Sequence, residues 1–224
     1  MSVNPVPVWA ANTRLPGLLH GLTDLSVRAD SVLPGWSRGH VLAHLAGVGN
    51  ALARQVEYAL EDRKVDVYDG GRPARDAGIA ANAGNPAADL VEDAVAASAA
   101  FDRALAKISP DDWGRSVVYR DGTLVEVVQA YWREIEIHST DLRLGYTPAT
   151  WSPEFSDHLL TFTAPRAPEG VQVLLRADDG GTWTWGTGTP VEVTGARNDL
   201  AAWAAGRTPV GSVHGDLPEL KPYP

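Results

Sequence analysis

The sequence predicts an α+β protein, a four-helix bundle followed by a small C-terminal α/β domain with a short three-stranded sheet. In the first two thirds of the chain, apolar residues recur at spacings of three and four, which is the period of amphipathic helices. After a linker rich in Pro and Thr at residues 147–153, short β-branched runs bounded by glycines replace this pattern. We therefore expect two domains, at residues 1–147 and 152–224.

The first half of the predicted bundle comprises two helices and a long connection. The first helix is expected at residues 6–25, although Pro16 and Gly17 interrupt the stretch and allow a later start. The second is expected to run from Ser37, whose side chain suits an N-cap, to about residue 62. Residues 63–85 are rich in Gly, Asp and Arg and predict a long loop with room for one short helix.

The second half of the bundle supplies the other two helices. One follows Pro86 and is expected to end near residue 108, before Ser109 and Pro110. A short extended piece with a turn is expected at residues 117–122. The fourth helix is expected at residues 124–142, and Gly145 follows its end.

The C-terminal region alternates between helix and strand patterns. A short helix is expected at residues 155–162. Three strand-like runs follow, separated by Gly-rich turns, and a last helix is expected before a Pro-rich tail. The strands are expected at residues 171–176, 182–185 and 191–194, and the last helix at residues 198–205.

Composition excludes several classes of partner. The 224 residues include 19 Lys and Arg against 28 Asp and Glu, a net charge of −9, so the surface should repel nucleic acid. No apolar run approaches the roughly 20 residues that a membrane span requires. The N-terminus lacks the basic flank of a signal peptide, so we expect a cytoplasmic protein. Monomer and dimer remain equally compatible with the sequence.

The chain contains no cysteine. Disulfides, thiolate metal sites and a cysteine nucleophile are therefore excluded. A metal ion would have to be bound by His, Asp, Glu or water, and any thiol chemistry would need a thiol from outside the protein.

The fourth predicted helix carries a possible pair of metal ligands. Glu134 and His138 are four residues apart, so they share one face of the helix, in line with its apolar stripe. An unpaired carboxylate pointing into the bundle would be costly. Glu136 lies about 200° around the helix from Glu134, and we expect it to be solvated.

The second predicted helix offers a third ligand. His44 borders the apolar stripe of that helix and can reach the interior. Two imidazoles and one carboxylate form a common catalytic zinc set, with the fourth position left to water or substrate. The same spacing also fits core histidines that hydrogen-bond to carbonyl groups, or a plain Glu–His pair.

Two motifs carry a resemblance to a known family. Residues 33–44 (LPGWSRGHVLAH) and residues 132–138 (WREIEIH) together resemble the mycothiol-dependent maleylpyruvate isomerases of the DinB-like metalloenzyme superfamily. The resemblance covers nearly the whole chain, including the small C-terminal domain. It implies that His44, Glu134 and His138 bind zinc, that His40 is not a ligand, and that mycothiol is the thiol cofactor or co-substrate.

The resemblance also nominates a residue of the C-terminal domain, which is expected to close the cleft. In the family an arginine after the last helix faces the metal cleft, and Arg207 matches it. A cation favoured by the dipole at a helix C-terminus is the alternative role. Asp141 could orient a ligating imidazole, serve as a cap or form a surface ion pair. Tyr68, Arg72 and Arg75 could line the cleft or be solvated loop residues.

The implied reaction is addition of a thiolate to the activated cis double bond of an anionic small molecule, rotation, and expulsion of the thiolate to give the trans isomer. If the reaction stopped after addition, the same site would be a mycothiol S-transferase. A non-catalytic metal-binding module would need a fourth protein ligand, for which His40 is the candidate. A hydrolase using zinc-bound hydroxide would need a general base, for which Glu136 or Asp141 is the candidate.

Overall fold

The computed structural model describes residues 4–224, which form eight α-helices and one four-stranded sheet. The predicted α+β class is therefore confirmed. The chain divides into two compact units, a helical unit that ends at Gly145 and a C-terminal unit that runs from Tyr146 to Pro224. Within the described range, every helix is too short or too polar to span a bilayer.

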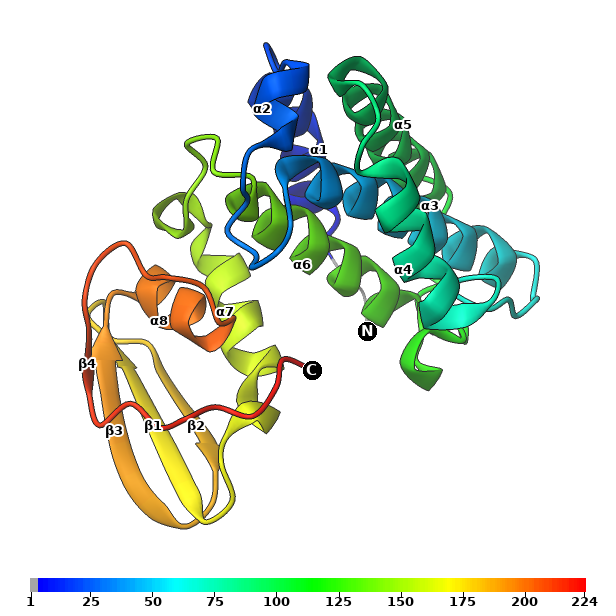
Figure 1. The fold of residues 1–224 in the computed structure, drawn as a ribbon. Helices are drawn as coiled ribbons and strands as arrows, with labels where there is room; N and C mark the ends of the chain where they lie inside the picture. Colours follow the sequence, from blue (N-terminus) through cyan, green and yellow to red (C-terminus); the bar gives the residue numbers. More distant parts are fainter. Residues whose placement is uncertain (1–3) are drawn as a thin grey trace. The chain divides into compact units, whose positions relative to one another are not determined.

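Four long helices make up most of the helical unit (Figure 1). They are α1 (Val6–Leu19), α3 (Arg38–Leu60), α5 (Ala87–Leu105) and α6 (Leu124–Asp141). Both α1 and α3 contact α5 as well as α6, so each of the four helices packs against two others. The contacts among these four helices thus form a closed ring. Their shared core is apolar and buried, and includes Leu15, Leu42, Leu52, Leu90, Phe101, Leu124 and Ile135.

Side-chain caps explain where the two central helices begin. The Ser37 hydroxyl accepts a hydrogen bond from the His40 backbone N–H, and the His40 ring accepts one from the Ser37 N–H. Thr123 and Glu126 form the same reciprocal pair at the start of α6. These capping boxes satisfy backbone groups that a helix start otherwise leaves unpaired. Both helices therefore begin where the sequence predicts.

The first predicted helix, residues 6–25, is wrong in its extent. Pro16 lies inside α1, which ends at Leu19, and a separate helix α2 (Asp24–Arg28) follows a capping box at Thr23. Pro16 removes one backbone hydrogen bond, but α1 continues because Leu19 beyond it is still buried.

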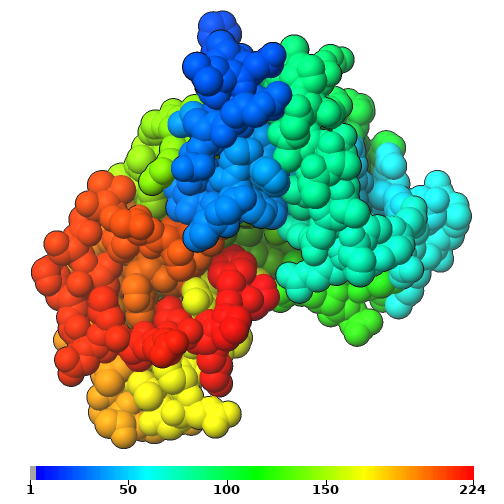
Figure 2. All heavy atoms as spheres, viewed as in Figure 1, coloured from blue at the N-terminus to red at the C-terminus, as the bar shows by residue number. Residues whose placement is uncertain are grey.

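Helix α2 is held against the start of α5. The Asp24 carboxylate accepts a hydrogen bond from the Ala87 N–H at 2.7 Å. In Figure 2 the blue atoms of α2 accordingly lie beside the green atoms of α5.

The connections between the long helices agree only in part with the prediction. Helix α4 (Gly71–Asn82) occupies about half of residues 63–85, where a long loop with room for one short helix was expected. The extended piece expected at residues 117–122 is instead a turn with a 3₁₀ segment, η1 (Tyr119–Asp121), closed by a single bridge between Ser116 and Thr123. A lone bridge gives these residues no neighbouring strand, so no strand forms.

The C-terminal unit is a small sheet with two helices (Figure 1). Its helices are α7 (Pro153–Phe162) and α8 (Arg197–Ala204), and short 3₁₀ segments lie at residues 148–150 and 164–166. The strands are β1 (Val171–Ala177), β2 (Thr182–Gly186), β3 (Thr189–Gly195) and β4 (Val213–Gly215), in the order β2-β1-β3-β4. Strands β1 and β3 are parallel, and the other two pairs are antiparallel.

The prediction of a three-stranded sheet is wrong, because the sheet has a fourth strand, β4. It has only three residues, which is too short to show the alternation by which strands are recognised in a sequence. It lies at the sheet edge beside β3. The preceding loop is held by the nearly buried Asp199, whose carboxylate accepts hydrogen bonds from the Val210 and Gly211 N–H groups at 2.8 and 2.9 Å.

Two glycines of α3 provide a matched test of helix packing. A Cβ on Gly39 would lie 2.3 Å from the Ala83 carbonyl oxygen, whereas a Cβ on Gly47 would meet nothing within 4 Å. We expect Gly39→Ala to destabilise the protein by about 1–3 kcal/mol through overpacking. Gly47→Ala should stabilise it by about 0.5–1 kcal/mol through helix propensity. Urea unfolding followed by circular dichroism measures both. Equal effects of the two substitutions would contradict the close approach of α3 to Ala83.

Candidate metal centre

Three side chains from two helices converge inside the helical unit. The Glu134 Oε2 atom lies 2.8 Å from His44 Nε2 and 3.2 Å from His138 Nε2. One potential ligand atom from each residue lies within 4.8 Å of the others. Within residues 4–224 this is the one group of three or more His, Asp and Glu side chains with such convergence.

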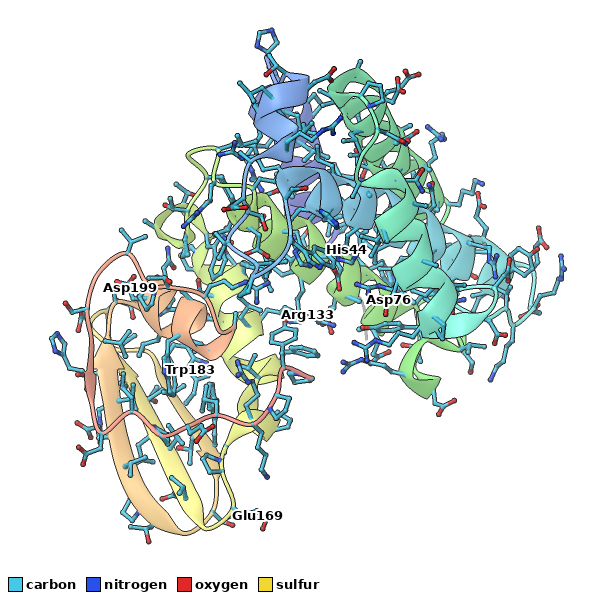
Figure 3. The ribbon with its side chains drawn as sticks, in the orientation of Figure 1. His44, Asp76, Arg133, Glu169, Trp183 and Asp199 are labelled. Atoms are coloured by element: carbon cyan, nitrogen blue, oxygen red, sulfur yellow. The ribbon has the colours of Figure 1, made fainter. Side chains whose placement is uncertain are left out.

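The helix geometry accounts for this convergence. Glu134 and His138 are one turn apart on α6, and His44 reaches them from α3, which packs against α6. Figure 3 shows His44 on the inner side of α3. Its side chain is only 4% exposed, whereas that of Glu134 is 31% exposed. The group is therefore buried at His44 and open at Glu134, so a small molecule can reach it.

Asp141 fixes the orientation of the His138 ring. Its Oδ2 atom lies 2.9 Å from His138 Nδ1, and the Asp141 side chain is completely buried. The His138 Nδ1–H therefore donates to the carboxylate, and Nε2 points toward Glu134. This contact is the one expected if Asp141 orients a ligating imidazole, which was one of the roles predicted for it.

His40 lies outside the group. Its Nδ1 atom is 2.8 Å from the Ser37 hydroxyl and also accepts the Ser37 N–H, so the ring is used in the cap of α3. The neighbouring Trp36, which the sequence reading did not assign to the site, packs against both histidine rings, 5.9 Å from His44 and 6.0 Å from His40 between ring centroids. In the sequence, the position of Trp36 directly before the capping Ser37 could have indicated that Trp36 lies near the site.

The three groups perturb one another's ionisation. Burial, together with the nearby His138, lowers the pKa of His44. Burial alone would raise the pKa of Glu134, but the hydrogen bonds from His138 and His44 outweigh it and hold that pKa well below its usual value. Burial opposes the charge of His138, but hydrogen bonds to Asp141 and Glu134 prevail and raise its pKa to about 9. At neutral pH the Glu134 carboxylate thus stays ionised between the neutral His44 and the protonated His138.

This donor set suits a divalent metal ion. Ligand atoms on a tetrahedral zinc ion lie about 3.3 Å apart, given metal–ligand distances of about 2.0–2.1 Å. The separations of 2.8 and 3.2 Å at Glu134 are close to this value. The ionised carboxylate of Glu134 and the neutral His44 are in the forms that a metal requires, and His138 would release the proton on Nε2 when a metal binds. The residues present therefore fit a metal bound by nitrogen and oxygen.

The prediction that the Glu136 side chain is solvated is wrong. Glu136 is 6% exposed, and its Oε2 atom lies 2.7 Å from Arg14 Nη2 on α1. Helix α1 covers this side of α6, and the guanidinium supplies the opposite charge that a buried carboxylate needs. Glu136 is therefore tied to packing within the helical unit, which argues against its role as a general base.

A cation lies on the other side of His44. The Arg75 Nη2 atom, from α4, is 3.2 Å from His44 Nδ1. The Tyr68 hydroxyl also interacts with Arg75, although burial has the larger effect on Tyr68 and raises its pKa. Two cavities of about 390 and 330 Å³ adjoin this point, and His44, Tyr68 and Arg75 line both. Tyr68 and Arg75 are therefore lining residues of these cavities, and Arg72 lines the smaller one.

Arg207 belongs to the C-terminal unit. It follows α8, and its Nη1 atom donates a hydrogen bond to the Ala205 carbonyl at 3.0 Å, near the end of that helix. This contact matches the role of a helix-end cation. A catalytic role for Arg207 stays a prediction.

The fold and the site define a class of two-unit proteins with a His–Glu–His centre between helices, and sequence comparison identifies the family. Residues 8–143 match the family model of the mycothiol maleylpyruvate isomerase N-terminal domain, and residues 150–222 match that of the corresponding C-terminal domain. The chain belongs to the mycothiol maleylpyruvate isomerase family. No significant match was found among curated proteins.

Two similar solved structures agree with this assignment at the level of the fold. One is a crystal structure of the mycothiol-dependent maleylpyruvate isomerase, with a TM-score of 0.85. The other is a histidine-to-alanine mutant of that enzyme, with a TM-score of 0.84. Each is 23% identical to this protein, and each match covers 96% of this chain and 94% of the other.

Removal of one proposed ligand tests the metal centre. We expect His44→Ala to lower metal affinity by more than the roughly 10- to 100-fold typical of losing a residue that only supports a ligand. His40→Ala is the matched control, one turn away on the same helix. It should keep the metal and lose only about 0.3–1.5 kcal/mol of stability with its cap. Elemental analysis of both dialysed variants gives the answer, and undiminished metal in His44→Ala would disprove the assignment.

Proposed function

We propose that this protein is a metal- and thiol-dependent cis–trans isomerase of the maleylpyruvate type. The observation that carries the proposal is the convergence of His44, Glu134 and His138 beside two cavities of the helical unit. Membership of the family gives that site a reaction class. We expect the protein to act in the cytoplasm, where low-molecular-weight thiols are kept reduced.

His44, Glu134 and His138 would hold one divalent metal, with zinc as the proposed ion. A metal with an open position acts as a Lewis acid and favours the thiolate form of an incoming thiol. The three residues leave the exposed side of Glu134 as the direction of approach. Asp141 would keep the His138 ring in the ligating orientation.

The thiol must come from outside, because the chain has no cysteine. Mycothiol is the proposed thiol, in keeping with the family. Its sulfur would add as a thiolate to one carbon of the cis double bond, and the electron pair of that bond would move into the conjugated carbonyl as an enolate. Rotation about the resulting single bond and expulsion of the thiolate would give the trans isomer. The thiol is regenerated, so atoms and charges balance without another reactant.

The residues around the cavities would surround the substrate and stabilise it during these reaction steps. Val48 and Leu52 give the smaller cavity an apolar wall that limits water, and Tyr68 remains a protonated hydroxyl that can donate a hydrogen bond. A donor placed beside a developing enolate lowers its energy. Besides the residues of the centre, the charged groups of the smaller cavity are Arg72 and Arg75 of α4.

The first test of this function is its thiol dependence. Metal-loaded protein should isomerise maleylpyruvate only when a low-molecular-weight thiol is added, with a rate that returns to zero after the thiol is removed by gel filtration. Product formation is followed by the absorbance of the trans isomer. Full turnover without thiol would indicate hydratase or hydrolase chemistry. Accumulation of a stable thioether would indicate a mycothiol S-transferase.

The second test concerns Arg207. If it binds the substrate, Arg207→Ala should lower kcat/KM by roughly 30- to 1,000-fold, or roughly 2–4 kcal/mol, and Arg207→Lys should not restore activity because an ammonium lacks the planar fork. Metal content and melting temperature should stay near those of the wild type. A variant that keeps its kcat/KM but loses stability would show that Arg207 only stabilises the end of α8.

A further inference from the structure

Arg75 lies where the two cavities of the helical unit meet. It is the one residue of α4 that both contacts His44 and lines both cavities. Its side chain is 23% exposed, and its Nη1 atom also pairs with Asp76 at 2.6 Å. Figure 3 shows Asp76 on α4. Arg75 is therefore held beside the candidate centre and is still accessible.

The two cavities differ in the charged side chains that line them. The smaller cavity is lined by Arg72 and Arg75, and its one carboxylate is Glu134, which is already shared by two imidazoles. The larger cavity is lined by Arg75 together with Asp93 and with Asp69, which is already paired with Arg54 at 2.7 Å. An anion is therefore favoured in the smaller cavity over the larger one. The overall charge of −9 makes such a local cationic site necessary for an anionic ligand.

The contact between Arg75 and His44 depends on which ring nitrogen carries the proton. His44 Nε2 faces a carboxylate and donates to it, so Nδ1 is the acceptor for Arg75. A cation bound to Nε2 would need that lone pair, and the ring proton would then reside on Nδ1. An Nδ1–H group cannot accept a hydrogen bond from a guanidinium. Binding of a metal ion at this centre would thus free the Arg75 Nη2 group to donate to another acceptor.

We propose that Arg75, with Arg72 beside it, is the anion-binding site of the helical unit and holds a carboxylate of the electrophile in the smaller cavity. With Nη1 held by Asp76, the Nε and Nη2 edge of the Arg75 guanidinium can bind a carboxylate through two parallel hydrogen bonds. The identity of the electrophile rests on the proposed function, whereas the preference for a carboxylate rests on the contacts and charges of Arg75. The bound anion lies next to Glu134, where the metal and the thiol would act.

Calorimetric titration of the zinc-loaded full chain with maleate tests the proposal without turnover. We expect Arg75→Ala to weaken maleate binding by about 10- to 100-fold, with zinc content unchanged. Arg75→Lys should recover only part of the affinity, because an ammonium cannot form the two parallel bonds. Retained affinity in Arg75→Ala would overturn the proposal, since it would mean that the metal or another residue holds the anion.

A matched variant locates the anion in one cavity. Gly47 lines only the larger cavity, and a Cβ there meets nothing within 4 Å, so Gly47→Leu should fold while filling that space. Maleate affinity should persist in Gly47→Leu and fall in Arg72→Ala. The opposite result would place the anion in the larger cavity and overturn the proposal.

The kinetic test separates this proposal from the proposed function. In an active enzyme, Arg75→Ala should raise the KM for maleylpyruvate at least as strongly as it lowers kcat. If the wild type binds maleate through Arg75 but has no thiol-dependent isomerase activity, the proposed function fails and the anion site stands. If the wild type is active and Arg75→Ala has an unchanged KM and maleate affinity, the anion site fails and the function stands.

Discussion

The shared carboxylate of Glu134 is the interaction on which the helical unit depends. It accepts from His44 on α3 and from His138 on α6, so two helices meet at one charged group. An ionisable group in this position is costly unless it is paired, which ties the placement of α3 against α6 to the ionisation of the cluster. Removal of either imidazole would leave a partly buried charge with fewer partners.

Local signals predicted the parts of this arrangement that depend on few residues. Ser37 was predicted as the N-cap of α3, and helical periodicity put Glu134 and His138 on one face of α6. Glu136 was misjudged because a helical wheel does not show that α1 covers that side of α6. The first predicted helix is divided because a capping box at Thr23 starts the separate helix α2. Strand β4 has too few residues to show a periodic pattern in the sequence.

The cationic surroundings of the centre were the least predictable part. Arg72 and Arg75 lie in a stretch whose Gly, Asp and Arg content resembles that of a solvated loop, and only the fold of α4 brings Arg75 to His44. From the sequence, both were possible cleft residues or solvated loop residues, and a role was given only to Arg207, through a family motif; that role stays a prediction. The observed hydrogen bond of Arg207 to Ala205 is local to the C-terminal unit. A sequence motif identifies a residue type at a position, whereas its partners depend on distant packing.

The residues that converge at Glu134 are far apart along the chain, since His44 precedes it by 90 residues. Closing a loop of this length costs conformational entropy before any contact is gained. During synthesis, α3 is made long before its partner α6. Until α6 is made, the apolar face of α3 is uncovered and His44 lacks its Glu134 partner. A nascent chain that has not yet reached α6 carries an incomplete core, with a helix surface open to association with other proteins or with chaperones.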